Sequence, residues 1–310
     1  MNPAYSVIFL TTLIGAGQGL FVALWGADLS GYGQQEGGRA FLVLGGMVAL
    51  LLTAGGLVAS FFHLGRPGRA WRSAAMWRTS WLSREVIALP LFMGGLFVWL
   101  VAQATHAAPL PLLGLLTLLA CLALFVCTAM VYASVRFLQE WASPYTLVNV
   151  ALLGLASGCT LATALAAYGA PPLVPAYGSA ALMLTAVAWL SRSLSLVRNA
   201  RLKPRSTLQT AIGIRHPKIT QRAMGFMGGS FNTREFFHGR SAGALRGVKW
   251  IFLLGAFALP LALLALGLSA GTPALLALAF AVQYLGLLAE RWFFLAQANH
   301  PQNLYYQAVS

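Results

Sequence analysis

The sequence predicts an all-α integral membrane protein, an eight-transmembrane-helix bundle, on the basis of its composition, segment lengths and charge distribution. Of its 310 residues, 59% are hydrophobic and only 8% are charged. Soluble domains carry about a quarter charged residues, so this chain lacks the polar surface that water requires. It is therefore expected in lipid, where helices or closed barrels must satisfy the backbone.

Eight apolar segments are long enough to cross the hydrocarbon core, which takes about 20 residues of helix. They are too long and too uniformly apolar to be barrel strands. We treat 1–310 as a single membrane domain with a long basic cytoplasmic loop over 192–247. The expected helices cover residues 4–27, 41–62, 86–105, 111–133, 145–167, 173–191, 248–268 and 273–297.

Basic residues are distributed unevenly between the two sides of the expected bundle. If the helices alternate in direction, Arg39 is the only one of the 20 Lys and Arg residues on its side. The positive-inside rule places the rich side, which holds both termini, in the cytoplasm of a bacterial inner membrane. The first apolar run follows MNPAYS without a basic stretch, so we expect a retained helix.

The net charge of +14 has two interpretations. It could only orient the chain and contact the headgroups of membrane lipid. It could also form a docking surface for an acidic protein, because the loops mix Arg with Trp and Phe as protein interfaces do. No nucleic-acid-binding module accompanies the charge, so nucleic acid is not expected as a partner. The arginines expected to dock a partner are Arg72, Arg78, Arg215, Arg222, Arg234 and Arg240.

The cysteines and histidines argue against a metal cofactor in this chain. Cys121, Cys127 and Cys159 lie in apolar segments and form no CxxC pair, so neither an iron–sulfur cluster nor zinc is expected. The five histidines lie at helix ends or in loops. A haem between two helices needs two histidines at matched depth, so haem is not expected either.

Two acidic residues lie at or inside the apolar segments, where ionisable groups are costly and face a cavity or a partner. Glu290 precedes Arg291, and we expect both to pair with groups of other helices in a structural role. Glu85 begins the third expected helix, whereas His63 ends the second. Antiparallel neighbours would bring these two side chains to the same membrane depth.

His63 and Glu85 therefore form a candidate quinone site. A quinone headgroup needs one group that hydrogen-bonds its oxygen and one that moves a proton, and histidine titrates in the useful range. Gln18, a polar residue within the first helix, could line the same cavity. The alternative is a helix-capping glutamate and an interfacial histidine that bind no ligand.

The stretch HLGRPGRAWRSAAMWRTSWLSREV, residues 63–86, resembles the DMSO reductase membrane-anchor subunit family. The family pattern is HLGxPxRA followed by S-x-L-S-x-E. The resemblance implies a haem-free anchor that binds quinone (ubiquinone or menaquinone). It also implies two partners, a four-cluster iron–sulfur subunit and a molybdopterin catalytic subunit. The functional His and Glu of the family match His63 and Glu85, and its Arg matches Arg69.

Two further stretches are similar to the anchors of cytoplasmic sulfite dehydrogenases in sulfur-oxidising bacteria. They are GFMGGSFNTREFFHG in the long loop and ERWFFLAQANH at the end of the last helix. This similarity implies catalytic partners in the cytoplasm, in agreement with the charge distribution. Sulfite as the primary donor is an expectation from this resemblance alone.

The expected function is electron exchange between a partner iron–sulfur cluster and membrane quinone. His63 would hydrogen-bond a quinone oxygen, and Glu85 would relay protons. Two alternatives are an assembly-only anchor without its own quinone site and a small-solute transporter. A transporter predicts broken or charged helices near the midplane and an internal repeat, which the sequence lacks. The arginines expected to steady the headgroup or hold the partner are Arg66, Arg69 and Arg84.

Overall fold

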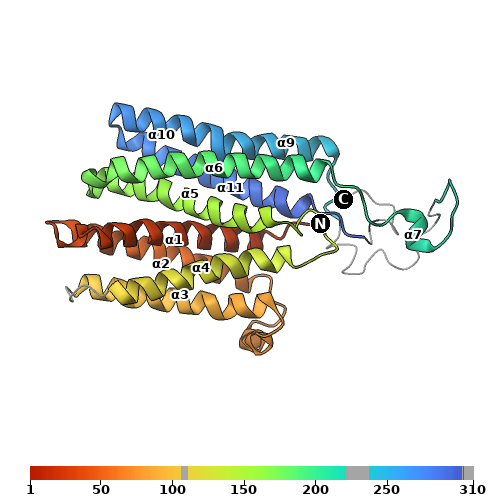
Figure 1. Cartoon of the computed structure of the whole chain (residues 1–310), viewed down its shortest axis with the longest axis horizontal. Helices are drawn as coiled ribbons and strands as arrows, with labels where there is room; N and C mark the ends of the chain where they lie inside the picture. The colour runs from red at the N-terminus through yellow and green to blue at the C-terminus, as the bar shows by residue number, and fades with distance from the viewer. Residues whose placement is uncertain (106–110, 221, 223–236, 302, 304–310) are drawn as a thin grey trace.

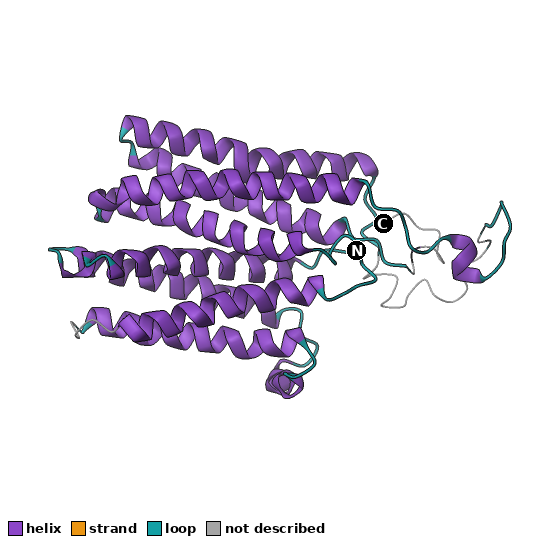
Figure 2. Ribbon diagram, in the orientation of Figure 1, coloured by secondary structure: helices purple, strands orange, loops and turns teal. Residues whose placement is uncertain are grey.

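The structure is a computed structural model that describes residues 1–105, 111–220, 222, 237–301 and 303. Within these residues it contains helices, turns and loops and no strand (Figure 2). Eight helices in this part are long and apolar enough to cross a membrane. They lie side by side along one axis, and Met1 contacts Ala298, close to the last described residues, at one end of the bundle (Figure 1). The predicted all-α, eight-helix membrane fold is confirmed.

The membrane spans follow the apolar segments of the sequence. They are α1 (Tyr5–Leu29), α2 (Gly38–Phe61), α3 (Trp81–Ala104), α4 (Pro111–Ala133), α5 (Pro144–Gly169), α6 (Val174–Ala200), α9 (Ala242–Leu253) continued through the π-turn η5 (Leu254–Ala258) into α10 (Leu259–Ala270), and α11 (Pro273–Ala296). The short helices are η1 (Tyr32–Gln34), η2 (Pro67–Met76), η3 (Pro171–Leu173) and α7 (Leu208–Ile212).

Two helix boundaries differ from the prediction, and each places a charged residue inside a span. Helix α3 begins at Trp81, where the Ser80 hydroxyl caps it by accepting the Ser83 N–H at 3.3 Å. Glu85 therefore lies about 6 Å inside the helix rather than at its start. Helix α6 continues to Ala200, so Arg192 lies within it and not in the loop. The carboxylate of Glu290 on α11 forms an ion pair with this buried arginine.

Close backbone contact joins α1 to α5. The GxxxG spacing of Gly15 and Gly19 predicts such packing, and these glycines face Gly154 and Gly158 of α5. A Cβ atom added at Gly158 would lie 2.1 Å from the carbonyl carbon of Gly19. Only residues without a side chain allow this approach. The contact places the middle of α1 beside α5.

The π-turn η5 follows from a proline. Pro260 has no N–H, so it cannot donate to the carbonyl of Ala256 one turn earlier. The amide Nε2 of Gln283 on α11 donates to that carbonyl at 3.5 Å instead. Gly286 of α11 packs against the same backbone, where an added Cβ would lie 2.1 Å from the nitrogen of Ala256. The irregular turn therefore locks α11 against the seventh span.

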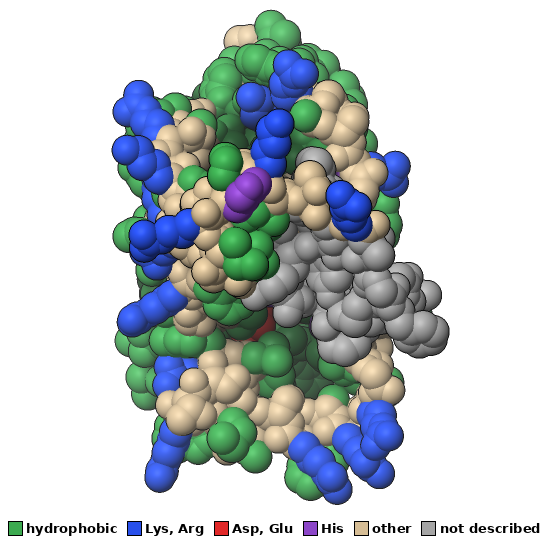
Figure 3. Space-filling model, turned by 90° about the vertical axis from the view of Figure 1, so that its right-hand side faces the viewer, with side chains coloured by type: hydrophobic (Ala, Val, Ile, Leu, Met, Phe, Trp, Pro, Cys, Tyr) green, Lys and Arg blue, Asp and Glu red, His purple; other side chains and the backbone are tan. Residues whose placement is uncertain are grey.

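We call the end of the bundle that carries Met1, Ala298, η2 and α7 the basic end (Figure 1). Lys and Arg side chains spread around the rim of this end (Figure 3). Arg39 lies at the other end, in the first turn of α2. The observed helix directions thus give the same charge asymmetry that alternation predicted.

Candidate functional site

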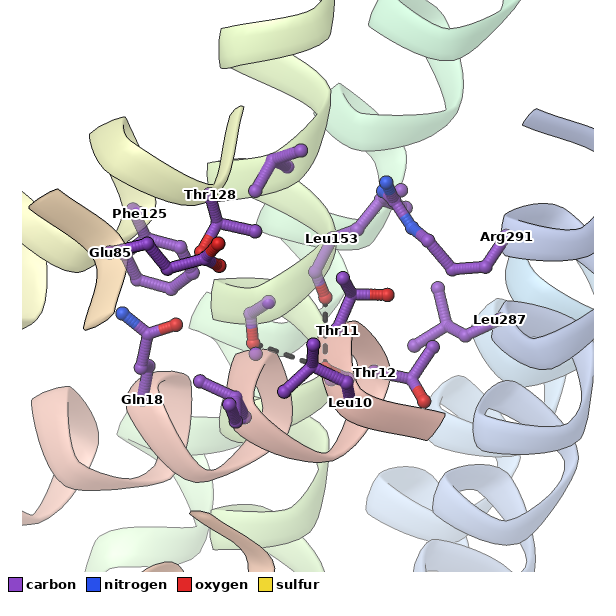
Figure 4. Close-up of a pocket in the computed structure, with 15 residues that line it drawn as sticks. Leu10, Thr11, Thr12, Gln18, Glu85, Phe125, Thr128, Leu153, Leu287 and Arg291 are labelled. Carbon is purple, nitrogen blue, oxygen red and sulfur yellow. Dashed lines mark hydrogen bonds between the residues drawn. The ribbon is translucent and has the colours of Figure 1, made fainter. Parts of the chain in front are cut away.

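A pocket opens inside the bundle among α1, α3, α4, α5 and α11, and 15 residues line it (Figure 4). Its apolar wall includes Leu10, Phe125, Leu153 and Leu287. Ligand pockets of this kind combine an apolar wall with a few polar groups that orient a ligand. The charged and polar side chains that line it are Thr11, Thr12, Gln18, Glu85, Thr128, Ser157 and Arg291.

Glu85 supplies a carboxyl group to the pocket from the first turns of α3. The Thr128 hydroxyl of α4 donates to its Oε1 at 2.5 Å. Both residues lie about one turn from the basic end of their helices, so they share a depth of roughly 6–8 Å. A carboxyl group at this depth, held by one donor, can exchange a proton between the pocket and the basic end.

Gln18 reaches the same pocket from α1 and is only 2% exposed. Its Nε2 donates to the carbonyl of Cys121 on α4 at 2.8 Å. This bond fixes the plane of the amide and leaves the amide oxygen as an acceptor beside the pocket. Gln18 and Glu85 thus line one pocket.

Arg291 enters the pocket from α11, opposite Glu85 (Figure 4). Its Nε lies 3.0 Å from Oε2 of Glu290, whose other oxygen lies 2.7 Å from Nε of Arg192 on α6. From the sequence we expected a structural role for Glu290 and Arg291, and we placed Arg192 in a loop. The sequence does contain a signal for Arg192, because it follows an apolar run whose helical pattern continues to residue 200.

The other residues predicted to bind quinone do not line this pocket. His63, Arg66 and Arg69 lie exposed between α2 and α3 at the basic end. Partial burial lowers the pKa of His63, which favours its neutral form. Arg84 donates to the carbonyls of Trp77 and Arg78, each at 2.8 Å, and so fastens the end of this segment to α3.

The arginines predicted to dock a partner lie on the surface of the basic end. The guanidinium of Arg72 lies 5.5 Å from the ring centre of Trp71, and that of Arg78 lies 5.4 Å from the ring centre of Trp77. These Arg–Trp pairs are exposed. Arg215, Arg222 and Arg240 are exposed as well, and Arg234 lies outside the described residues.

No group of three or more His, Cys, Asp and Glu residues in the described chain could hold a metal ion. The three cysteines are free and buried in the helices. The expectation that this chain carries neither haem nor an iron–sulfur cluster stays a prediction.

Fold and pocket define a multi-pass membrane protein with a polar site near one membrane face. Residues 1–213 match the DMSO reductase anchor subunit (DmsC) family. The chain is also 53% identical to a sulfite dehydrogenase subunit from Allochromatium vinosum, over an alignment of 325 positions that covers all of both chains. The chain belongs to the DMSO reductase anchor subunit family and is a membrane-anchor subunit of an oxidoreductase.

Proposed function

We propose that this chain is the quinone-binding anchor of a three-subunit molybdopterin and iron–sulfur oxidoreductase. The observation that carries the proposal is the position of Glu85, which belongs to the motif of residues 63–86 and lines a polar pocket inside the membrane span. The relative named as a sulfite dehydrogenase subunit supports sulfite as the primary substrate of the complex.

The chemistry of the pocket suits a quinone headgroup. Quinone takes up two electrons and two protons to become quinol, and the reverse reaction releases them. The electrons pass between the headgroup and an iron–sulfur cluster of the partner. Glu85, held by Thr128, exchanges protons with the headgroup, and the amide oxygen of Gln18 can accept a hydrogen bond from the quinol hydroxyl. His63 lies at the basic end, where it can exchange protons with water.

The basic end is the proposed docking surface for the iron–sulfur subunit, which in turn carries the molybdopterin subunit. The positive-inside rule places this end, and both chain ends with it, in the cytoplasm of a bacterial inner membrane. A partner docked here would hold its nearest cluster above the pocket, since Glu85 lies only about 6 Å inside the helix end. Both the charge and the pocket depth support this arrangement.

Replacing Glu85 by Gln tests the proposal. Glutamine keeps the size of the side chain but cannot exchange a proton, so the assembled complex should lose nearly all quinone-linked turnover. Oxidation of substrate with an artificial soluble acceptor should continue, because that route bypasses the pocket. Glu36→Gln, the same change at an exposed site at the other end of the bundle, serves as the matched control.

Unaltered quinone turnover in the Glu85→Gln complex would contradict the assignment. A photoreactive quinone analogue gives an independent check on membranes that contain the whole complex. Label on peptides from α1, α3 or α11 supports the proposal, whereas label confined to the partner subunits supports an assembly-only anchor.

A further inference from the structure

Two arginines and one glutamate form a buried ion cluster at the α11 side of the pocket. Arg192 and Glu290 are each 1% exposed, and Arg291 is 7% exposed. Glu290 is shared, with one oxygen at 2.7 Å from Arg192 and the other at 3.0 Å from Arg291. One carboxylate thus faces two guanidinium groups, which are always charged. The cluster carries an excess of one positive charge inside the membrane span.

The described residues leave this excess charge uncompensated. No carboxylate other than Glu290 lies within 4.0 Å of either arginine in the described chain. The guanidinium of Arg192 lies over the rings of Phe252 and Phe293, at 5.4 and 6.0 Å from their centres. An unpaired charge is costly at such a site. A negative or electron-rich group that enters the pocket would offset this cost.

Arg291 is the member of the cluster that can meet such a group. It lines the pocket, whereas Arg192 and Glu290 do not. Its Nε lies 3.0 Å from Oε2 of Glu290, and its two terminal nitrogens make no hydrogen bond to the described residues. Figure 4 shows its side chain extending from α11 toward the pocket, while Glu85 approaches from α3 on the other side. The pocket therefore has a charged or polar group at each of two opposite poles, Glu85 at one and Arg291 at the other.

We infer that Arg291 binds the quinone oxygen that lies away from Glu85. This inference rests on the proposed function. It gives Arg291 the role of steadying the headgroup, which the sequence analysis assigned to Arg66, Arg69 and Arg84. The two oxygens of a quinone lie on opposite edges of the ring, which matches two opposite poles. Two electrons reach the headgroup from the partner's cluster, Glu85 delivers one proton to the oxygen on its side, and the second proton reaches the far oxygen from water. The guanidinium stabilises the negative charge that develops on the oxygen and transfers no proton.

Glu290 and Arg192 act as positioning residues in this arrangement. Glu290 forms an ion pair with Arg291 through Nε, which leaves the terminal nitrogens available to the pocket that Arg291 lines. Arg192 forms an ion pair with the other oxygen of Glu290, at 2.7 Å from Nε. Removal of the Arg291 charge would leave Arg192 and Glu290 as a neutral pair, so the cluster should survive an Arg291→Gln substitution.

Binding of two headgroup analogues to the detergent-solubilised complex tests the inference. The probes are a hydroxynaphthoquinone, which is an anion at neutral pH, and a methylnaphthoquinone, which is neutral. The wild-type complex should prefer the anion. Arg291→Gln should reduce affinity for the anion by about tenfold or more, since a charge-assisted hydrogen bond is lost, and should leave the neutral probe nearly unaffected. Arg291→Lys should keep the preference.

Arg246→Gln is the matched control, because Arg246 is an exposed cation at the same end of the bundle and does not line the pocket. A wild-type complex that binds the neutral probe as tightly as the anion overturns the inference without any variant. An equal effect of Arg291→Gln on both probes also overturns it and leaves the proposed function intact. Failure of the wild-type complex to bind either probe, with photolabel on the partners alone, overturns the proposed function itself.

Discussion

At the residue scale, the hydrogen bond between Thr128 and Glu85 joins α4 to the carboxyl group that α3 supplies to the pocket. The hydroxyl donates to one carboxylate oxygen at 2.5 Å and therefore favours the ionised form of Glu85. Desolvation by the surrounding helices acts in the opposite direction, because it disfavours a charge. A carboxyl group under these two opposing effects can gain and lose a proton in turn, as a proton relay requires.

Thr128→Val removes the donor and conserves the shape of the side chain. The ionised carboxylate then loses a charge-assisted hydrogen bond worth about 1.5–3 kcal/mol. We expect quinone-linked turnover to fall about tenfold or more, because Glu85 then holds its proton more tightly. Steady-state assays with a soluble quinone measure this effect. Thr128→Ser retains the hydroxyl and should turn over nearly as fast as wild type. A Thr128→Val variant with wild-type turnover would show that the hydrogen bond between Thr128 and Glu85 does not affect the reaction.

Some residues of the pocket could be predicted from sequence because they stand out chemically. Glu85 and Gln18 are polar residues in apolar segments, where such groups usually face an interior. Thr128 could not be singled out, because threonines in membrane helices commonly bond their own backbone, as Thr117 does with Leu113. Arg291 was expected only in a structural role beside Glu290, since nothing in its local sequence indicates that its side chain lines a pocket with Glu85.

At the element scale, the contact between α1 and α5 fixes the geometry of the pocket. Both helices line it, and Gly15 and Gly154 form part of its wall. The helices approach so closely because glycines meet glycines at the contact. Apolar length predicted that each helix exists, but the partners of each helix depend on side-chain shape across distant segments. For this reason the sequence did not predict that α11 lines the pocket.

Gly158→Ala tests this contact. The added methyl group would lie 2.1 Å from the carbonyl carbon of Gly19 and 2.2 Å from the nitrogen of Leu20, which are backbone atoms that cannot move alone. We expect a destabilisation of about 1–3 kcal/mol, typical of overpacking. Thermal unfolding in detergent should show a lower Tm.

Gly94→Ala is the control for the alanine substitution at Gly158. An added Cβ at Gly94 of α3 meets nothing within 4 Å, so only the higher helix propensity of alanine should act there. Equal Tm values for the Gly158→Ala protein and the wild type would mean that α1 and α5 can separate without cost.

At the scale of the whole molecule, charge and pocket depth point to the same end. The Lys and Arg residues spread around the basic end, and the ionisable groups of the pocket lie about one turn inside it (Figure 3). This asymmetry could be predicted from helix alternation alone, since it needs only the order of segments and loops. What binds at the basic end could not be predicted in the same way, because it depends on the surface of a second molecule.

Charge reversal at the exposed Arg–Trp pairs tests whether a protein covers this end. The double variant Arg72→Glu and Arg78→Glu replaces attraction by repulsion toward an acidic partner. Exposed ion pairs contribute about 0.2–1 kcal/mol each, so loss of two pairs with added repulsion should weaken association about tenfold. Co-purification of the iron–sulfur subunit with the anchor at moderate salt measures this association. Arg39→Glu, at the opposite end of the bundle, should leave co-purification unchanged. If the double variant also co-purifies normally, these two arginines contact lipid headgroups, and the docking surface must lie elsewhere on the basic end.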